Sequence, residues 1–105
     1  WDRTARQIRN QVLAMQPWPG CFTHWRPAQG QPVRLNLIQV EVESEEGAHR
    51  RDEAGRVVIA ERDLLVVQAG EGRVRLLVVQ PAGKNPMDVS DFLRGRKVQV
   101  DDQFE

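Results

Sequence analysis

The chain has 105 residues, a length that suits one domain with a modest core and needs neither disulfides nor a metal. Its 15 basic and 15 acidic residues give zero net charge, which argues against a dedicated nucleic-acid binder whose whole surface is positive. Cys21 is the single cysteine, and with two scattered histidines it gives no zinc-ligand spacing. We therefore expect no metal and a reducing, cytoplasmic setting.

The apolar stretches are strand-sized and far shorter than a membrane span, so we expect no membrane partner. The first residues, Trp1 to Arg3, have neither an initiator methionine nor the apolar core of a signal peptide, which suggests a piece of a longer polypeptide. Charge is unevenly distributed along the chain. Residues 1–40 hold five arginines against Asp2 alone, giving +4, whereas residues 41–63 hold eight acids against four arginines, giving −4. The sequence therefore allows a positively charged face but does not show which residues form it.

The first predicted element is an amphipathic helix capped by Asp2 or Thr4. Four apolar residues recur at helical spacing, namely Ala5, Ile8, Val12 and Met15. Arginines, among them Arg6 and Arg9, lie between them and predict a cationic outer face. Pro17 ends the helix because a proline pushes the preceding residue out of the α region and donates no hydrogen bond.

A rigid elbow of Pro17, Trp18, Pro19 and Gly20 follows the helix. The prolines stiffen it, and the glycine supplies freedom where the chain turns into a strand. We expect Trp18 to plug one end of a barrel and to join the apolar face of the helix to Phe22. The alternative is a platform on which Trp18 stacks against a nucleotide base.

Short β segments fill the middle of the chain. A strand-like pattern begins at Cys21, and residues 33–42 alternate with a phase change at 37–38 that predicts a bulge. After a polar loop over 43–56, tight turns separate three more segments, at 57–60, 64–67 and 74–78. Five or six short strands at regular spacing are typical of a small barrel.

The final segment predicts a second short helix. Asp88 is its expected N-cap, with Asp91 three residues later as an acidic variant of the capping box, and Gly95 ends it. A last strand is expected over 98–100. The predicted fold class is mainly β with two short helices, an open Greek-key barrel of the oligonucleotide-binding type that spans residues 1–105 as one domain.

Two motifs carry a resemblance to a known family. The first is Pro-Trp-Pro-Gly at 17–20, and the second comprises Gly83, Lys84, Pro86, Met87, Asp91, Phe92, Leu93, Gly95 and Arg96. With the order of elements between them, they resemble the C-terminal domain of methionyl-tRNA formyltransferases over nearly the whole chain. The resemblance implies a noncatalytic domain that helps to position initiator tRNA. Formyl transfer from 10-formyltetrahydrofolate would then occur on an N-terminal Rossmann-like domain of the same polypeptide, which this chain lacks.

The resemblance also implies which side chains contact tRNA. The candidates in or beside the late motif are Lys84, Arg94, Arg96 and Lys97, and Arg6 and Arg9 on the first helix are further candidates. The alternative for the late cations is an ordinary solvated face paired with Asp88 and Asp91.

No catalytic, cofactor-binding or metal-binding residue is predicted in the chain itself. Neither His24 nor His49 has a partner that would make it a base, and Cys21 opens an apolar strand instead of lying in a cationic setting. The alternative function is a structural interface domain in another formyltransferase, acting on a nucleotide sugar or a carrier-bound amino acid.

Overall fold

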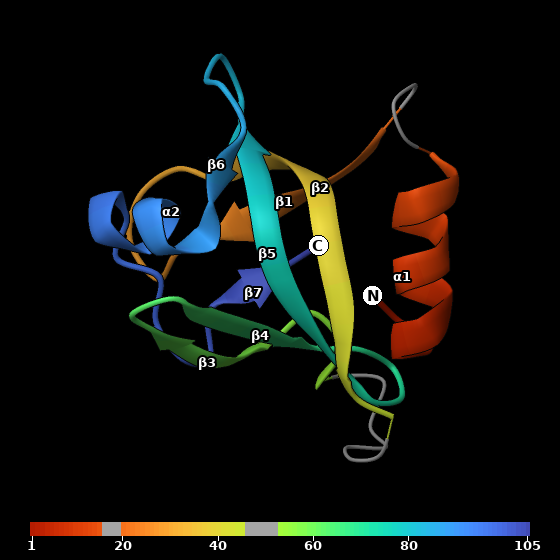
Figure 1. Cartoon of the computed structure of the whole chain (residues 1–105). Coiled ribbons are helices and arrows are strands. Elements are labelled where there is room, and N and C mark those ends of the chain that lie inside the picture. The colour runs from red at the N-terminus through yellow and green to blue at the C-terminus, as the bar shows by residue number, and fades with distance from the viewer. Residues whose placement is uncertain (16–19, 46–52) are drawn as a thin grey trace.

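A computed structural model of the protein describes residues 1–15, 20–45 and 53–105 (Figure 1). The helices are α1 (Ala5–Ala14) and α2 (Val89–Gly95). The strands are β1 (Cys21–Arg26), β2 (Val33–Ser44), β3 (Val57–Glu61), β4 (Leu64–Gln68), β5 (Arg73–Pro81), β6 (Met87–Asp88) and β7 (Gln103–Phe104). The predicted mainly β fold with two short helices is confirmed. Within these described ranges the sheet has seven strands, because the two-residue strands β6 and β7 join it.

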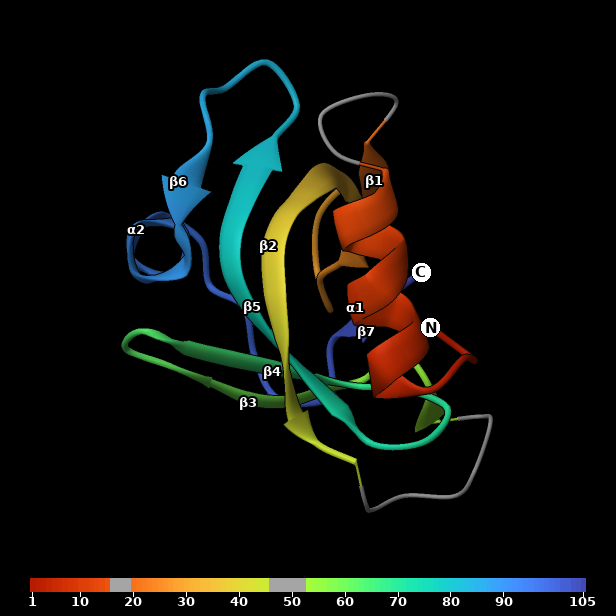
Figure 2. The ribbon, with the colours of Figure 1, turned by 45° about the vertical axis from the view of Figure 1, so that its right-hand side comes forward.

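The sheet curls into a nearly closed barrel (Figure 2). Its strand order is β3-β4-β5-β2-β1-β7, with β6 added beside β5, and β5 returns to pair with β2 in a Greek-key arrangement. The two ends of this order meet along a seam. Val57 N donates to Asp102 O at 2.8 Å, and Phe104 N donates to Gly55 O at 2.7 Å. The end of the chain therefore closes the barrel against the segment that leads into β3.

The predicted bulge lies in the long strand β2. Leu37 pairs with Val79 and Gln39 pairs with the adjacent Val78, so the register slips at Ile38. A bulge bends its strand and increases the local twist. This bend lets β2 pair with β1 over its first half and with β5 along its length.

Helix α1 begins where a capping box satisfies its first backbone groups. Gln7 N donates to Thr4 Oγ1 at 3.1 Å, and Thr4 N donates to Gln7 Oε1 at 3.0 Å, so Thr4 and not Asp2 is the cap. The apolar face predicted from the spacing is buried at Ala5, Ile8 and Val12. This face joins the core of the barrel.

Helix α2 packs on the other side of the barrel through Phe92, which is fully buried and meets Trp25 edge-on at 6.0 Å between ring centroids. Asp88 is the N-cap residue, but its side chain makes no capping hydrogen bond, so the predicted acidic capping box is wrong. Asp91 pairs with Arg94 instead. Within the described ranges, neither helix combines the length and the hydropathy needed to cross a bilayer.

The predicted last strand was placed a few residues too early. Val98 is buried and Val100 is exposed, and neither belongs to a strand, whereas β7 forms at Gln103–Phe104. Strand pairing there depends on the distant partners Trp25 and Arg26 in β1. A local apolar alternation does not reveal such partners.

Candidate nucleic-acid interface

The late motif forms one end of the molecule, around α2 and the turn after β5. Lys84 lies in that turn, where its backbone N–H donates to Pro81 O at 3.0 Å and Gly83 has a φ of +76°. A solvent-open pocket of about 360 Å³ separates the turn from the helix, and its lining includes both Lys84 and Arg96. The structure therefore brings together two of the cations predicted from the sequence.

The cations of this end differ in how far they are neutralised. Arg94 forms an ion pair with Asp91 one helical turn away. Lys84, Arg96 and Lys97 are exposed, and within residues 1–15, 20–45 and 53–105 none of them forms an ion pair. We call these three residues the late cationic group. Their charges face solvent and are available to an anionic ligand.

The arginines of α1 lie apart from the late cationic group. Figures 1 and 2 show α1 and α2 on opposite sides of the barrel. Arg6 is paired with Glu45, and the half-buried Arg9 donates to Asn10 Oδ1 at 3.1 Å. Four of the six predicted contact residues thus lie on or beside α2 or the turn after β5, although Lys97 lines a separate pocket beside Pro27. The other two lie on α1, where the charge of Arg6 is already compensated.

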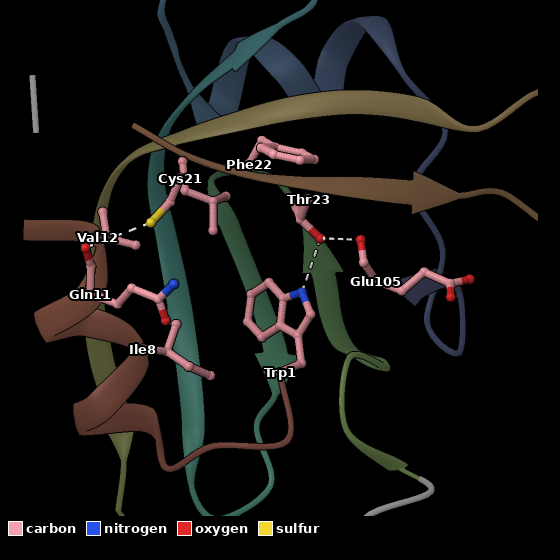
Figure 3. Close-up of a pocket in the computed structure, with 9 residues that line it drawn as sticks. Trp1, Ile8, Gln11, Val12, Cys21, Phe22, Thr23 and Glu105 are labelled. Carbon is pink, nitrogen blue, oxygen red and sulfur yellow. Dashed lines mark hydrogen bonds between the residues drawn. The ribbon is translucent and has the colours of Figure 1, made fainter. Parts of the chain in front are cut away.

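A smaller pocket of about 170 Å³ lies between α1 and β1 (Figure 3). Trp1 Nε1 donates to Thr23 Oγ1 at 3.0 Å, and that hydroxyl donates to the backbone O of Glu105 at 2.9 Å. The Cys21 thiol donates to Gln11 O at 3.6 Å, and burial raises the pKa of this thiol. Its thiol is therefore neutral at physiological pH and poorly nucleophilic.

Sequence reasoning missed the position of Phe22. This ring was expected inside, next to Trp18, but it is 55% exposed on the outer face of β1, across the strand from Trp1 (Figure 3). Its neighbour Thr23 is the buried residue, because Trp1 and Glu105 satisfy its hydroxyl. The strict alternation that makes Trp25 point inward was the signal that places Phe22 outside. Trp18, for which a plug or a base platform was expected, lies outside the described residues, as do Pro17 and Pro19.

The sequence of the chain matches a known protein family. Residues 1–97 match the family model described as "Formyl transferase, C-terminal domain". The chain belongs to this family. That match includes both motifs on which the resemblance was based, and it ends at Lys97.

Three relatives of the chain are named methionyl-tRNA formyltransferase. This chain is 42% identical over 107 residues to a methionyl-tRNA formyltransferase of Streptococcus suis, and the alignment covers 99% of this chain and 31% of that protein. Proteins of the same name from Pelotomaculum thermopropionicum and Pseudoalteromonas translucida are 40% and 36% identical over 90% and 91% of this chain. In these two relatives the alignment covers 28% of the protein. The chain thus spans less than a third of the length of these relatives.

Proposed function

We propose that this domain positions initiator tRNA for formyl transfer in a methionyl-tRNA formyltransferase. The formyl donor, 10-formyltetrahydrofolate, would bind to a catalytic domain elsewhere in the same polypeptide. The observation that carries the proposal is the similarity to methionyl-tRNA formyltransferases over 99% of the chain in the Streptococcus suis relative. The exposed late cationic group also supports the proposal. Because the chain has zero net charge, attraction to RNA must come from a local group of unpaired cations such as this one.

The proposed contact is electrostatic and centred on α2. Lys84, Arg96 and Lys97 would neutralise phosphates of the tRNA, and the released counterions would make binding sensitive to salt. Such contacts position an RNA without reading its sequence, which suits a domain that orients a substrate for another domain. Arg94 joins this surface with part of its charge compensated by Asp91, and Arg6 and Arg9 provide a second contact on α1.

The test is a titration of labelled initiator tRNA with the chain at two salt concentrations. Exchanging Arg96 and Lys97 together for glutamine should weaken binding and lower the salt slope by about 0.7–0.9 for each phosphate that is no longer neutralised. Arg56→Gln, an exposed arginine outside both groups, is the matched control and should leave the slope unchanged. Binding that does not respond to salt, or that is equally strong in the double variant, would contradict the proposal.

A second candidate is an interface domain in a formyltransferase with a different acceptor. The description of the matched family refers to formyl transferases in general and does not specify which molecule accepts the formyl group. Two surface residues, Leu13 on α1 and Phe22 on β1, are large, apolar and exposed, as an interface would require. Absence of tRNA binding at low salt would favour this candidate.

A further inference from the structure

On the outer face of the barrel, the exposed ring of Phe22 lies in a row of polar side chains. Phe22 in β1 lies directly opposite Asn36 in β2, and Asn36 lies opposite Gln80 in β5. Directly opposed residues of antiparallel strands point to the same side of the sheet. The three side chains therefore form a continuous row across three strands, which we call the Phe22 row.

This row leads to the late cationic group. Asn36 Nδ2 lies 3.4 Å from Gln80 Oε1, and Gln80 Nε2 donates to the backbone O of Lys84 at 3.0 Å. Neighbouring strands are about 4.8 Å apart, so the row spans roughly 10 Å from Phe22 to Gln80. Phe22 and Lys84 thus lie at the two ends of one connected surface, although sequence reasoning had joined only Lys84 to RNA binding.

A single exposed phenylalanine is ordinary on a protein surface, and the surroundings of Phe22 are what distinguish it. The Arg34 guanidinium lies over the ring, 4.2 Å from its centroid. His24 meets the ring edge-on, with centroids 5.8 Å apart. Within the described ranges Arg34 forms no ion pair, so its charge is held against the ring but remains uncompensated.

The composition of this surface selects the chemistry of its ligand. The Phe22 row contains no acid, and the cations Arg34 and Lys84 lie at its two ends, which favours an anionic ligand over a basic or neutral protein surface. A flat apolar ring beside cations is the arrangement that binds single-stranded nucleic acid, where bases stack and phosphates are neutralised. The bases of a duplex are already stacked on one another, so the ring selects an unpaired nucleotide.

We infer that Phe22 stacks against an unpaired base of the bound RNA while Arg34 and Lys84 contact phosphates of the same strand. The inference rests on the proposed function for the identity of the RNA, since the row itself would accept any unpaired strand. It assigns a role to the ring and to Arg34, neither of which belongs to the late motif.

The test measures binding of a short labelled oligoadenylate and of a duplex of equal length to the 105-residue chain, whose barrel encloses its own core. Phe22→Leu should weaken oligoadenylate binding roughly 5- to 150-fold, the range that corresponds to one stacked base. Its salt slope should stay unchanged because no charge is removed. Arg34→Gln should lower both the affinity and the slope.

Two controls separate stacking from general damage. Phe22→Tyr keeps a ring and should bind like the parent chain, and Leu13→Ala removes another exposed apolar side chain, 62% exposed on α1, without effect. In the unaltered chain, an oligonucleotide that carries 5-iodouridine should crosslink to the peptide containing Phe22 on irradiation. This readout does not depend on how well any variant folds.

Unchanged binding by Phe22→Leu, a crosslink confined to other peptides, or equal affinity for duplex and single strand would overturn the inference. In one outcome, the salt slope of initiator tRNA binding falls in the double variant of Arg96 and Lys97, but Phe22→Leu does not change oligoadenylate affinity. The inference then fails and the proposed function stands. If Phe22→Leu abolishes oligoadenylate binding but initiator tRNA binds no better than other RNA, the inference stands and the proposed function fails.

Discussion

The indole nitrogen of Trp25 donates a hydrogen bond of 3.0 Å to Oδ2 of Asp102, which lies 77 residues further along the chain. The same carboxylate oxygen accepts the backbone N–H of Gln99 at 3.0 Å. Both Trp25 and Asp102 are buried, and the backbone O of Asp102 accepts the N–H of Val57 in the barrel seam. One acidic residue thus joins the inside of β1 to the turn before β7.

Replacing Asp102 should destabilise the domain. Asp102→Ala would leave the indole N–H of Trp25 buried without a partner, which costs about 1–3 kcal/mol of unfolding free energy. Asp102→Asn keeps an acceptor and should lose less. Urea unfolding followed by tryptophan fluorescence measures the difference, and Asp63→Ala, at an exposed turn position, should change stability by less than about 0.5 kcal/mol. Equal losses at Asp63 and Asp102 would contradict this account.

The seam also predicts a strict requirement for glycine at position 55. Gly55 has a φ of +88°, and a Cβ there would collide with the backbone oxygen of Phe104. Gly55→Ala should therefore cost more than about 1 kcal/mol of stability. Gly95→Ala is the matched control, because its Cβ would meet open space and its φ is not positive. Thermal unfolding of the two variants compares them, and an unaffected Gly55→Ala would argue against the seam.

The burial of Cys21 has a consequence for pH dependence. Burial raises the pKa of the Cys21 thiol in the folded chain, so the neutral thiol is favoured there relative to the unfolded chain. This contribution to stability is fully present below the ordinary thiol pKa and is lost as pH rises through the higher folded value. Alkylation by iodoacetamide should be slower than for free cysteine at mildly alkaline pH, and urea should restore the ordinary rate. An alkylation rate of the folded chain equal to that of free cysteine would contradict the raised pKa of the Cys21 thiol.

The two groups of predicted tRNA contacts should contribute unequally. Arg6 is already paired with Glu45, so its loss removes less uncompensated charge than the loss of Arg96. Arg6→Gln with Arg9→Gln should weaken initiator tRNA binding less than Arg96→Gln with Lys97→Gln does. Fluorescence anisotropy at low salt measures both pairs. A larger effect on the α1 side would move the main contact surface to that helix.

Those parts of the fold that depend on local pattern were predictable from the sequence. The apolar spacing of Ala5, Ile8 and Val12 predicted the buried face of α1, and the phase change after Leu37 predicted the bulge at Ile38. Each of these signals concerns residues close together in the chain. The resemblance located the late motif, and the structure shows why Lys84 and Arg96 are neighbours across one pocket.

Features that depend on distant partners were not predictable in this way. Thr23 is buried because Trp1 and Glu105 satisfy its hydroxyl, and neither partner is apparent from the residues around it. Phe22 is a different case, because it was expected inside as a partner of Trp18 although the alternation with Trp25 places it outside. The position of β7 is fixed by β1 and by the segment before β3, and an apolar alternation near Val98 gave no indication of either.

The seam also has a consequence for synthesis on the ribosome. His24 and Glu105 exchange two backbone hydrogen bonds, at 2.7 and 2.9 Å, and Phe104 closes the sheet against Gly55. These bonds cannot form until the residues around Phe104 have left the exit tunnel. Until then β1 and the start of β3 remain unpaired edges, so nascent chains of this domain carry open strands until its last residues emerge.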